Sequence, residues 1–364
     1  MVKTILIVAS EFPPLPGGIG NHAYNLATEF SKSHKKVIVL TEKRTDSESE
    51  WIAFCDSAEF EIIGIKRNRL IFYTYLKRVI IFLFLSIKLN PITFFSGKFS
   101  IWLAAINPTK KNSFAIIHGS EIRCKGVWKR IFHKGLNSVE KIISVSKFTQ
   151  NILFETYEID KTKCIVINNG FQLENNENKT IIKNFGSQLE FVTIGGMHQR
   201  KGQHNFIQSL PNIIARFGNV RYHIAGIPEE LDRLKELAES LDVLKNIHFY
   251  NSPTNAEVLD LLKRSDIFVM VSENLENGHI EGFGIAILEA MSMGLPAIGS
   301  KNTGIEDAIL NDFSGVLVNH SSAEEITDAV YKIQQNYSEF SENALLWCEK
   351  FRWERVIYQY EELL

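Results

Sequence analysis

Two glutamates in the second half of the chain frame a glycine-rich turn whose residue types could do chemistry. Residues 280–290 read IEGFGIAILEA, with Glu281 before the glycines and Glu289 after them. The apolar run after Gly284 predicts a helix, whose first backbone amides have no intrahelical partner. Gly282 and Gly284 would let the backbone approach a ligand without a Cβ clash. A carboxylate accepts hydrogen bonds from hydroxyls but repels phosphate, so the stretch indicates a ligand with hydroxyls on both sides of a phosphate.

A second stretch supplies the positive charge that such a ligand needs. Residues 194–206 read IGGMHQRKGQHNF: two glycines end a predicted strand, Arg200 and Lys201 follow, and Gly202 begins a predicted helix. Cations and free amides that converge at a helix N-terminus suit a diphosphate. The alternative is a solvated basic turn. Together the two stretches favour a nucleotide sugar, in which a diphosphate separates a sugar from a ribose.

Two motifs in the first half follow predicted strands. The loop PLPGGIGNH leads from a strand into a helix, and Gly18 in it could approach a phosphate or a sugar. It is neither a P-loop nor a complete GxGxxG fingerprint, which argues against a nicotinamide-dependent dehydrogenase. IIHGSEIR places His118 directly after a buried strand. The alternatives are an ordinary glycine-rich turn and a structural histidine.

The order of elements predicts an α/β fold with two domains. Short apolar strands alternate with helical stretches up to residue 170, a polar linker covers 172–188, and the pattern then restarts. We expect two doubly wound, Rossmann-like sheets in domains 1–170 and 171–345, facing across a cleft. Residues 342–364 predict an amphipathic helix with aromatic residues, and we expect 346–364 to return to the first domain.

Composition narrows the class of protein. The four cysteines are scattered without metal-ligand spacing and indicate reduced thiols in a cytosolic protein. No signal peptide is recognisable, and the longest apolar run, 79–87, is shorter than the roughly 20 residues that span a bilayer. The chain has no Asp-x-Asp pair suited to a metal–diphosphate complex. We therefore expect a cytoplasmic protein that needs no metal and no cofactor.

Charge is unevenly distributed. Residues 1–170 carry 24 Lys and Arg against 14 Asp and Glu, whereas residues 171–364 carry 16 against 28. Residues 66–134 contain 14 basic residues and a single acid, interleaved with Phe, Tyr and Trp. This pattern suits an anionic membrane surface. We expect peripheral docking to the inner face of the cytoplasmic membrane; a buried helix with a solvated basic face is the alternative, and no nucleic-acid-binding module is recognisable.

These motifs resemble those of the retaining glycosyltransferases of the GT-B fold, the large family that includes bacterial mannosyltransferases, lipopolysaccharide hexosyltransferases and sucrose synthases. The stretches PPLPGGIGNH, HGSE, RKGQ and EGFGIAILEAMSMGLPAIGS occur in the family's order and spacing, over essentially the whole chain. The glutamate, seven residues, glutamate signature is its most specific element. One departure is Gly196, where the family usually carries an arginine; Arg200 is the candidate replacement.

The resemblance implies a role for each of these positions. Glu281 would contact hydroxyls of the donor sugar, Glu289 the ribose, and Lys201 the diphosphate. Gly18 would approach the phosphates from the first domain, and His118 would lie beside the donor sugar. The remaining donor-binding positions implied are Gly196, Arg200, Gly282, Phe283, Gly284 and Ile285.

The resemblance also implies a reaction. It is retaining transfer of a hexose or N-acetylhexosamine from a UDP- or GDP-sugar to a glycan, expected to be lipid-linked, in the synthesis of cell-surface polysaccharide such as lipopolysaccharide O-antigen. Two other classes remain open. One is a nucleotide-sugar-binding protein without transferase activity, which Gly196 favours. The other is a non-hydrolysing sugar-nucleotide epimerase, which shares the two-domain fold but lacks the spacing of Glu281 and Glu289.

Overall fold

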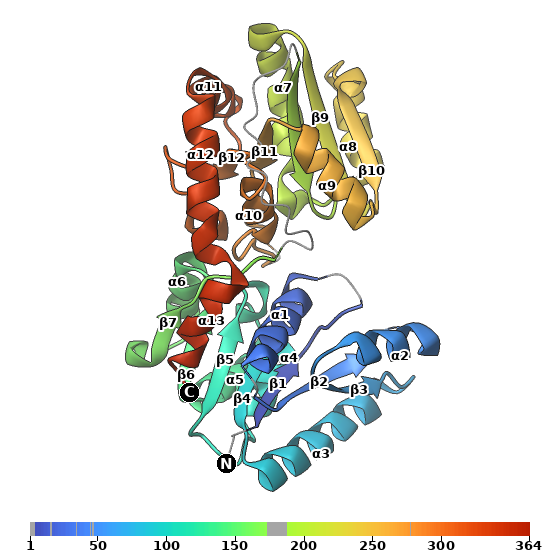
Figure 1. The fold of residues 1–364 in the computed structure, drawn as a ribbon, viewed down its shortest axis with the longest axis vertical. Coiled ribbons are helices and arrows are strands. Elements are labelled where there is room, and N and C mark those ends of the chain that lie inside the picture. Colours follow the sequence, from blue (N-terminus) through green and yellow to red (C-terminus); the bar gives the residue numbers. More distant parts are fainter. Residues whose placement is uncertain are drawn as a thin grey trace. The chain divides into compact units, whose positions relative to one another are not determined.

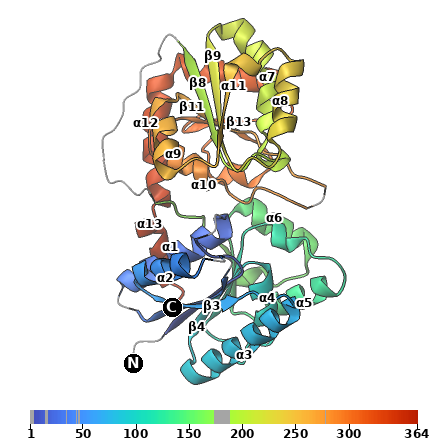
Figure 2. The ribbon, with the colours of Figure 1, turned by 90° about the vertical axis from the view of Figure 1, so that its right-hand side faces the viewer.

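The computed structural model describes residues 4–14, 17–33, 35–43, 45, 47–172, 188–276 and 278–364. The predicted linker at 172–188 lies almost entirely outside this part of the chain. The described residues form two compact units (Figures 1 and 2). Unit 1 comprises Met1–Gly170 and Trp353–Leu364, and unit 2 comprises Phe171–Arg352.

Unit 1 is a parallel sheet of seven strands in the order β3-β2-β1-β4-β5-β6-β7. Its strands are β1 (Ile5–Ala9), β2 (Val37–Lys43), β3 (Glu61–Lys66), β4 (Ile92–Ser96), β5 (Ser113–Ile117), β6 (Lys141–Ser144) and β7 (Cys164–Val166). Its helices are α1 (Gly18–Lys32), α2 (Glu48–Ser57), α3 (Ile71–Leu89), α4 (Lys98–Ala104), α5 (Gly126–Asn137), α6 (Lys147–Thr156) and α13 (Trp353–Glu361).

Unit 2 is a parallel sheet of six strands in the order β10-β9-β8-β11-β12-β13. Its strands are β8 (Leu189–Ile194), β9 (Val220–Gly226), β10 (Ile247–Asn251), β11 (Ile267–Met270), β12 (Ala297–Ser300) and β13 (Gly315–Val318). Its helices are α7 (Gln203–Phe217), α8 (Leu231–Ser240), α9 (Asn255–Arg264), α10 (Ile285–Met291), α11 (Ala323–Gln335) and α12 (Tyr337–Cys348).

The strands form because their apolar residues can be covered on both faces of a parallel sheet. Every residue of β1, β4 and β5 is buried, and helices lie on both faces of each sheet (Figure 2). The strand order reverses direction between β1 and β4 in unit 1, and between β8 and β11 in unit 2. Such switch points leave a crevice at the carboxyl ends of the strands, where ligands bind in doubly wound folds. The predicted α/β fold with two doubly wound sheets is therefore confirmed.

The C-terminal stretch differs from the single helix expected over 342–364. Helix α12 ends at Cys348, a 3₁₀ turn follows, and α13 begins at Trp353. Arg352 between them is extended, with ψ 137°, and the amide of Phe171 donates to the carbonyl of Phe351 at 2.9 Å. That contact uses backbone that a continuous helix would have occupied. Helix α13 then packs on α1 in unit 1.

Candidate functional site

A 3₁₀ turn of unit 2, Gln199–Lys201, carries the two cations that the sequence singles out. It follows β8 and leads directly into α7 through Gly202, whose φ is 75°. A Cβ on Gly202 would lie 1.9 Å from the carbonyl oxygen of Val271. Only glycine fits this contact, so the turn is pressed against the end of β11 and both cations lie at the switch point.

Both cations of the turn converge on the carboxylate of Glu281. Lys201 Nζ lies 2.8 Å from Glu281 Oε2, and Arg200 Nη1 forms a second ion pair with the same oxygen. Burial alone would raise the pKa of Glu281, but the charges of Lys201 and Arg200 outweigh it and lower that pKa to about 2. The carboxylate therefore stays ionised at any physiological pH.

The backbone of Glu281 is held from the other side by the loop after β12. The amide of Gly304 donates to the carbonyl of Glu281 at 3.0 Å. A Cβ on Gly304 would lie 2.1 Å from the carbonyl oxygen of Gly282. The two backbone segments therefore lie too close together for any residue other than glycine at position 304. Gly284 has a φ of 89° and begins α10 as its N-cap. The predicted start of this helix near Gly284 is confirmed.

The amides that follow Gly282 are available to a ligand. Those of Phe283, Gly284 and Ile285 donate to no acceptor within the described part of the chain. Helix α10 has only seven residues, so these individual amides matter more than its dipole. They lie next in sequence to the carboxylate on which Arg200 and Lys201 converge, as the sequence predicts for an anion site.

Glu289 projects from α10 and is half-buried. Burial raises its pKa to about 7, and the charge of Lys201 opposes that rise. Its carboxyl group has no hydrogen-bond partner among the described residues. A carboxyl group close to Lys201 but unsatisfied can accept hydrogen bonds from ligand hydroxyls.

Arg200 points into the site because of His198, a residue that the sequence analysis does not single out. Arg200 Nη2 lies 3.3 Å from His198 Nε2, while its Nη1 reaches Glu281. A Cβ on Gly196 would lie 3.2 Å from the imidazole of His198. The histidine ring thus occupies space that a side chain at position 196 would need. Its place inside GGMHQRKG is the only sequence signal for this role.

Unit 1 places His118 at the carboxyl end of β5. Its Nε2 lies 3.0 Å from Ser96 Oγ, and its ring meets that of His22 edge-on at 4.9 Å. Burial lowers the pKa of His118 to about 3, so the ring is neutral. Its backbone amide donates to Glu121 Oε1 at 2.5 Å. Glu121 stands in the HGSE motif but is not among the residues predicted for the site.

Gly18 lies at the start of α1, also in unit 1. A Cβ there would meet no atom within 4 Å, so the backbone is open. The neighbouring Gly17 lies beside a carboxylate, because a Cβ on it would be 3.1 Å from Glu11 Oε2. A phosphate approaching Gly18 would therefore meet a negative charge at the same helix N-terminus.

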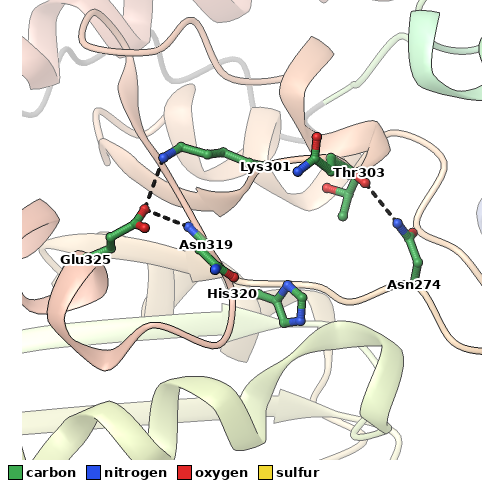
Figure 3. Close-up of a pocket in the computed structure, with 7 residues that line it drawn as sticks. Asn274, Lys301, Thr303, Asn319, His320 and Glu325 are labelled. Carbon is green, nitrogen blue, oxygen red and sulfur yellow. Dashed lines mark hydrogen bonds and ion pairs between the residues drawn. The ribbon is translucent and has the colours of Figure 1, made fainter.

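A polar pocket of about 390 Å³ lies near the carboxyl ends of β12 and β13 (Figure 3). Lys301 Nζ lies 3.0 Å from Glu325 Oε2, which also accepts the amide of Asn319 at 2.9 Å. Asn274 Nδ2 donates to the carbonyl of Asn302 at 2.8 Å. These polar groups are paired with one another, and none of the predicted site residues lines the pocket.

Comparison with known proteins gives the family. The model described as "Glycosyl transferases group 1" matches residues 174–346, and the model described as "Glycosyltransferase Family 4" matches residues 16–175. Together they span nearly the whole chain, with one model for each half. The protein belongs to the group 1 glycosyltransferases, which confirms the predicted family; the retaining course of the reaction and the roles of the motif residues stay predictions.

Individual relatives are distant. A glycosyltransferase of Methanocaldococcus jannaschii is 25% identical over 252 residues, which cover 66% of this chain and 60% of that protein. WcaL of Salmonella typhimurium, named for colanic acid biosynthesis, is 29% identical over 143 residues, covering 39% of this chain and 35% of that protein. The match thus spans less than two thirds of either relative.

Solved structures support the fold over the full length. Anabaena Alr3699/HepE, in complex with UDP-glucose, superposes with a TM-score of 0.77 at 16% sequence identity, covering 99% of this chain and 98% of that one. At this identity the likeness shows the fold alone. With the two parallel sheets of unit 1 and unit 2 it identifies the GT-B fold.

The contact between Gly202 and Val271 yields a stability prediction. Gly202→Ala should lower the free energy of unfolding by about 3 kcal/mol or more, because it combines a left-handed backbone with overpacking. Gly126→Ala is the control, since φ there is 60° and a Cβ would meet nothing within 4 Å; it should cost about 1 kcal/mol. Urea denaturation measures both. Equal losses would show that the turn is not pressed against β11.

Proposed function

We propose that this protein is a retaining hexosyltransferase that uses a UDP- or GDP-sugar as donor. The observation that carries the proposal is the convergence of Arg200 and Lys201 on Glu281, beside the unpaired amides that follow Gly282. A donor of this type brings a dianionic diphosphate between two hydroxyl-bearing rings. The site holds cations, amides and two carboxyl groups in a matching order, and Alr3699/HepE, a relative in fold, is known with UDP-glucose.

Donor binding would exchange the partners of the two cations. Without ligand, Arg200 and Lys201 neutralise Glu281. With a diphosphate present, both cations can contact its oxygens, and the amides of Phe283 and Gly284 can donate to it as well. Glu281, still ionised, would then accept hydrogen bonds from hydroxyls of the donor sugar, while Glu289 accepts them from the ribose.

The reaction we propose is front-face transfer. The bond between the anomeric carbon and the diphosphate breaks, the acceptor oxygen attacks the same face, and the leaving diphosphate takes the acceptor's proton. The protein then has to stabilise negative charge on the leaving group, which is the role of Lys201, Arg200 and the amides. His118 of unit 1, neutral and partly exposed, would contact the donor sugar. In this proposal the reaction needs neither a metal nor a cofactor.

Arg200 serves in this proposal as the second diphosphate cation. Its two terminal nitrogens contact Glu281 and His198, and a side chain at position 196 would crowd the His198 ring that takes part in this arrangement. The departure from the family pattern at Gly196 is then a relocation of the cation by four residues and not its loss. This favours an active enzyme over a binding protein without activity.

Arg200→Ala tests the relocated cation. Loss of one charge-assisted contact should weaken donor binding and lower kcat/KM for the donor by about tenfold to a hundredfold. The measurement is transfer from UDP- and GDP-sugars to lipid extracted from the source cells. Arg216→Ala is the control, because Arg216 lies at the opposite end of α7 in an exposed ion pair with Asp328 and should keep the wild-type rate.

An unchanged rate in Arg200→Ala would contradict the role of Arg200. Absence of turnover by the wild-type protein, with nucleotide binding retained, would instead favour the binding protein without transferase activity. Interconversion of the nucleotide sugar without any acceptor would favour the epimerase.

The acceptor we propose is a lipid-linked glycan, reached from the membrane surface. Helix α3 leaves large apolar side chains in solvent: Phe72 is 67% exposed, Phe84 59% and Ile87 73%. Phe82 and Leu85 of the same helix are buried, so α3 packs on unit 1 with one face and presents apolar side chains on the other. The relative WcaL is named for colanic acid biosynthesis, and WaaG, a relative in fold, for lipopolysaccharide biosynthesis; both names support an acceptor of this class.

An aromatic series joins α3 to α5 and extends this surface. Tyr75 of α3 stacks on Phe99 of α4 at 4.1 Å, Phe99 meets Trp102 at 5.6 Å, and Trp102 stacks on Trp128 of α5 at 4.3 Å. Trp128 is itself 50% exposed. Lys77 and Lys88 of α3 and Lys129 and Arg130 of α5 are exposed as well. An apolar surface accompanied by such cations fits an anionic bilayer at the inner face of the cytoplasmic membrane.

Flotation with vesicles tests the membrane surface. Among the described residues no helix is long and apolar enough to cross a bilayer. Wild-type protein should float with phosphatidylglycerol vesicles at low salt, and the triple variant Phe72→Ser, Ile80→Ser, Phe84→Ser should bind about tenfold more weakly. Ile52→Ser, at an exposed site on α2, is the control. Failure of the wild-type protein to float would refute the membrane surface.

A further inference from the structure

Glu121 is a buried acid that the proposed reaction does not use, and it lies directly against His118. It sits in a 3₁₀ turn, Ser120–Ile122, that follows β5, and only 5% of it is exposed. Its Oε1 accepts the backbone amide of His118 at 2.5 Å. Gly119 between the two has a φ of 135°, a conformation that side chains rarely adopt. The carboxyl group therefore fixes the turn that presents the His118 ring.

The amides of Gly119 and Glu121 also act on this carboxyl group, but its second oxygen is not satisfied. Oε2 is buried and makes no hydrogen bond within the described part of the chain. A buried carboxylate needs a cation or several donors to be stable. The charged group that acts on it from the segment after β1 is Glu11, which is itself an acid.

The other titratable groups around this turn do not supply a positive charge. Cys124 Sγ donates to the carbonyl of Glu121 at 3.1 Å, and Tyr157, at the end of α6, donates its hydroxyl to the carbonyl of Ile122 at 2.8 Å. His118 is neutral, as shown above. From α4, Lys98 acts on the Cys124 thiol but not on the Glu121 carboxyl group.

We propose that Glu121 is a positioning residue for His118 and that it performs this role in its protonated, neutral form. The proposal rests on the proposed function, because it assumes that His118 takes part in transfer. A neutral carboxyl group can hold the His118 amide without placing a negative charge beside Glu11. Ionisation would place a second negative charge beside Glu11 in a buried site, at a cost that the backbone donors of the turn do not offset. Opening of the turn to water would relieve that cost and misplace the His118 ring.

The pKa of Glu121 agrees with this geometry. Burial raises it from 4.5 to about 7; the backbone donors, among them the His118 amide, oppose that rise, and Glu11 adds to it. The folded state therefore keeps a proton between pH 4.5 and about 7 that the unfolded state has lost. Stability from this group is greatest in acid and declines as the pH rises towards 7. The transfer rate depends on the turn that presents His118. It should therefore decline as Glu121 ionises in the folded protein, near pH 7.

Glu140 provides a matched control for Glu121, because both glutamates accept a backbone amide but only Glu121 is buried. Glu140 also accepts a backbone amide, that of Asn112 at 2.6 Å, but it is exposed and lies at the opposite, amino edge of the same sheet. Glu121→Gln keeps an oxygen for the His118 amide and cannot titrate. Glu121→Ala removes the contact altogether, and Glu140→Gln repeats the glutamine change at the control site.

The experiment compares each variant with the wild-type protein between about pH 5.5 and 8.5. It records the free energy of unfolding, the transfer rate and the amide NMR signal of His118. Because Glu289 also titrates near pH 7, the quantity to follow is the difference between wild type and Glu121→Gln.

We expect Glu121→Gln to match the wild-type rate within about threefold at pH 6 and to exceed it increasingly as the pH passes through 7. Its gain in stability over the wild type should grow up to about pH 7 and level off above that. The His118 amide signal should shift through pH 7 in the wild-type protein and not in this variant. Glu121→Ala should lose transfer at every pH, and Glu140→Gln should follow the wild type.

Parallel pH profiles of Glu121→Gln and the wild-type protein, in stability and in the His118 signal, would overturn the proposal. Complete absence of transfer by the wild-type protein would refute the proposed function instead. In that case the stability and NMR comparisons still decide whether Glu121 holds His118 as a neutral acid.

Discussion

The carboxylate of Glu281, held between Lys201 and Arg200, is the interaction on which the site of unit 2 depends. A buried carboxylate without partners is strongly unfavourable, and removing one partner of a buried ion pair typically costs about 3–5 kcal/mol. The chain therefore has to bring the turn after β8 to the end of β11. Gly202 makes that approach possible, because its contact with the carbonyl of Val271 excludes any side chain. The need to neutralise the Glu281 carboxylate therefore determines the backbone geometry of the turn after β8 and of the segment after β11.

The two units differ in the charge of the groups at their switch points: those of unit 2 are ionised, whereas those of unit 1 are largely neutral. The edge of unit 2 carries two cations around an ionised carboxylate. At the corresponding edge of unit 1, burial lowers the pKa of His22 well below its usual value and that of His118 to about 3, and raises that of Glu121 to about 7. These three groups are largely neutral near pH 6. Under the proposed function, unit 2 would neutralise the diphosphate, and unit 1 would contact the sugar and the acceptor without competing for that charge.

Sequence patterns predict most of the helices and strands, because these elements depend on the residue types within a short stretch of the chain. Apolar runs that end at small residues predict the strands, and Gly284 followed by an apolar run predicts the start of α10. The break between α12 and α13 is not predictable in this way, since the contact of Phe351 with Phe171 joins segments far apart in sequence. Nothing in the residue types around 349–352 overrides the helical pattern on either side.

The site was predictable in its residue types but not in its side-chain directions. Lys201, Glu281 and Glu289 follow from spacing alone. The orientation of Arg200 depends on the imidazole of His198 and on Glu281, which lies 81 positions away. Likewise, the role of Glu121 depends on its burial and on the fold of the turn after β5, which composition does not reveal. Arg200 and Glu121 both stand inside recognised motifs, but a motif does not tell where a side chain points or what it contacts.

The central claim is that Lys201 and its neighbours bind a nucleotide diphosphate. The most direct test is calorimetric titration of UDP, GDP and ADP into the wild-type protein and Lys201→Ala, with Lys245→Ala on the exposed surface as control. We expect one of the three nucleotides to bind the wild-type protein at one site. Its affinity should fall by about tenfold or more in Lys201→Ala, through loss of a charge-assisted contact, and stay unchanged in Lys245→Ala. Equal affinities for the wild-type protein and Lys201→Ala, or no binding of any of the three, would contradict it.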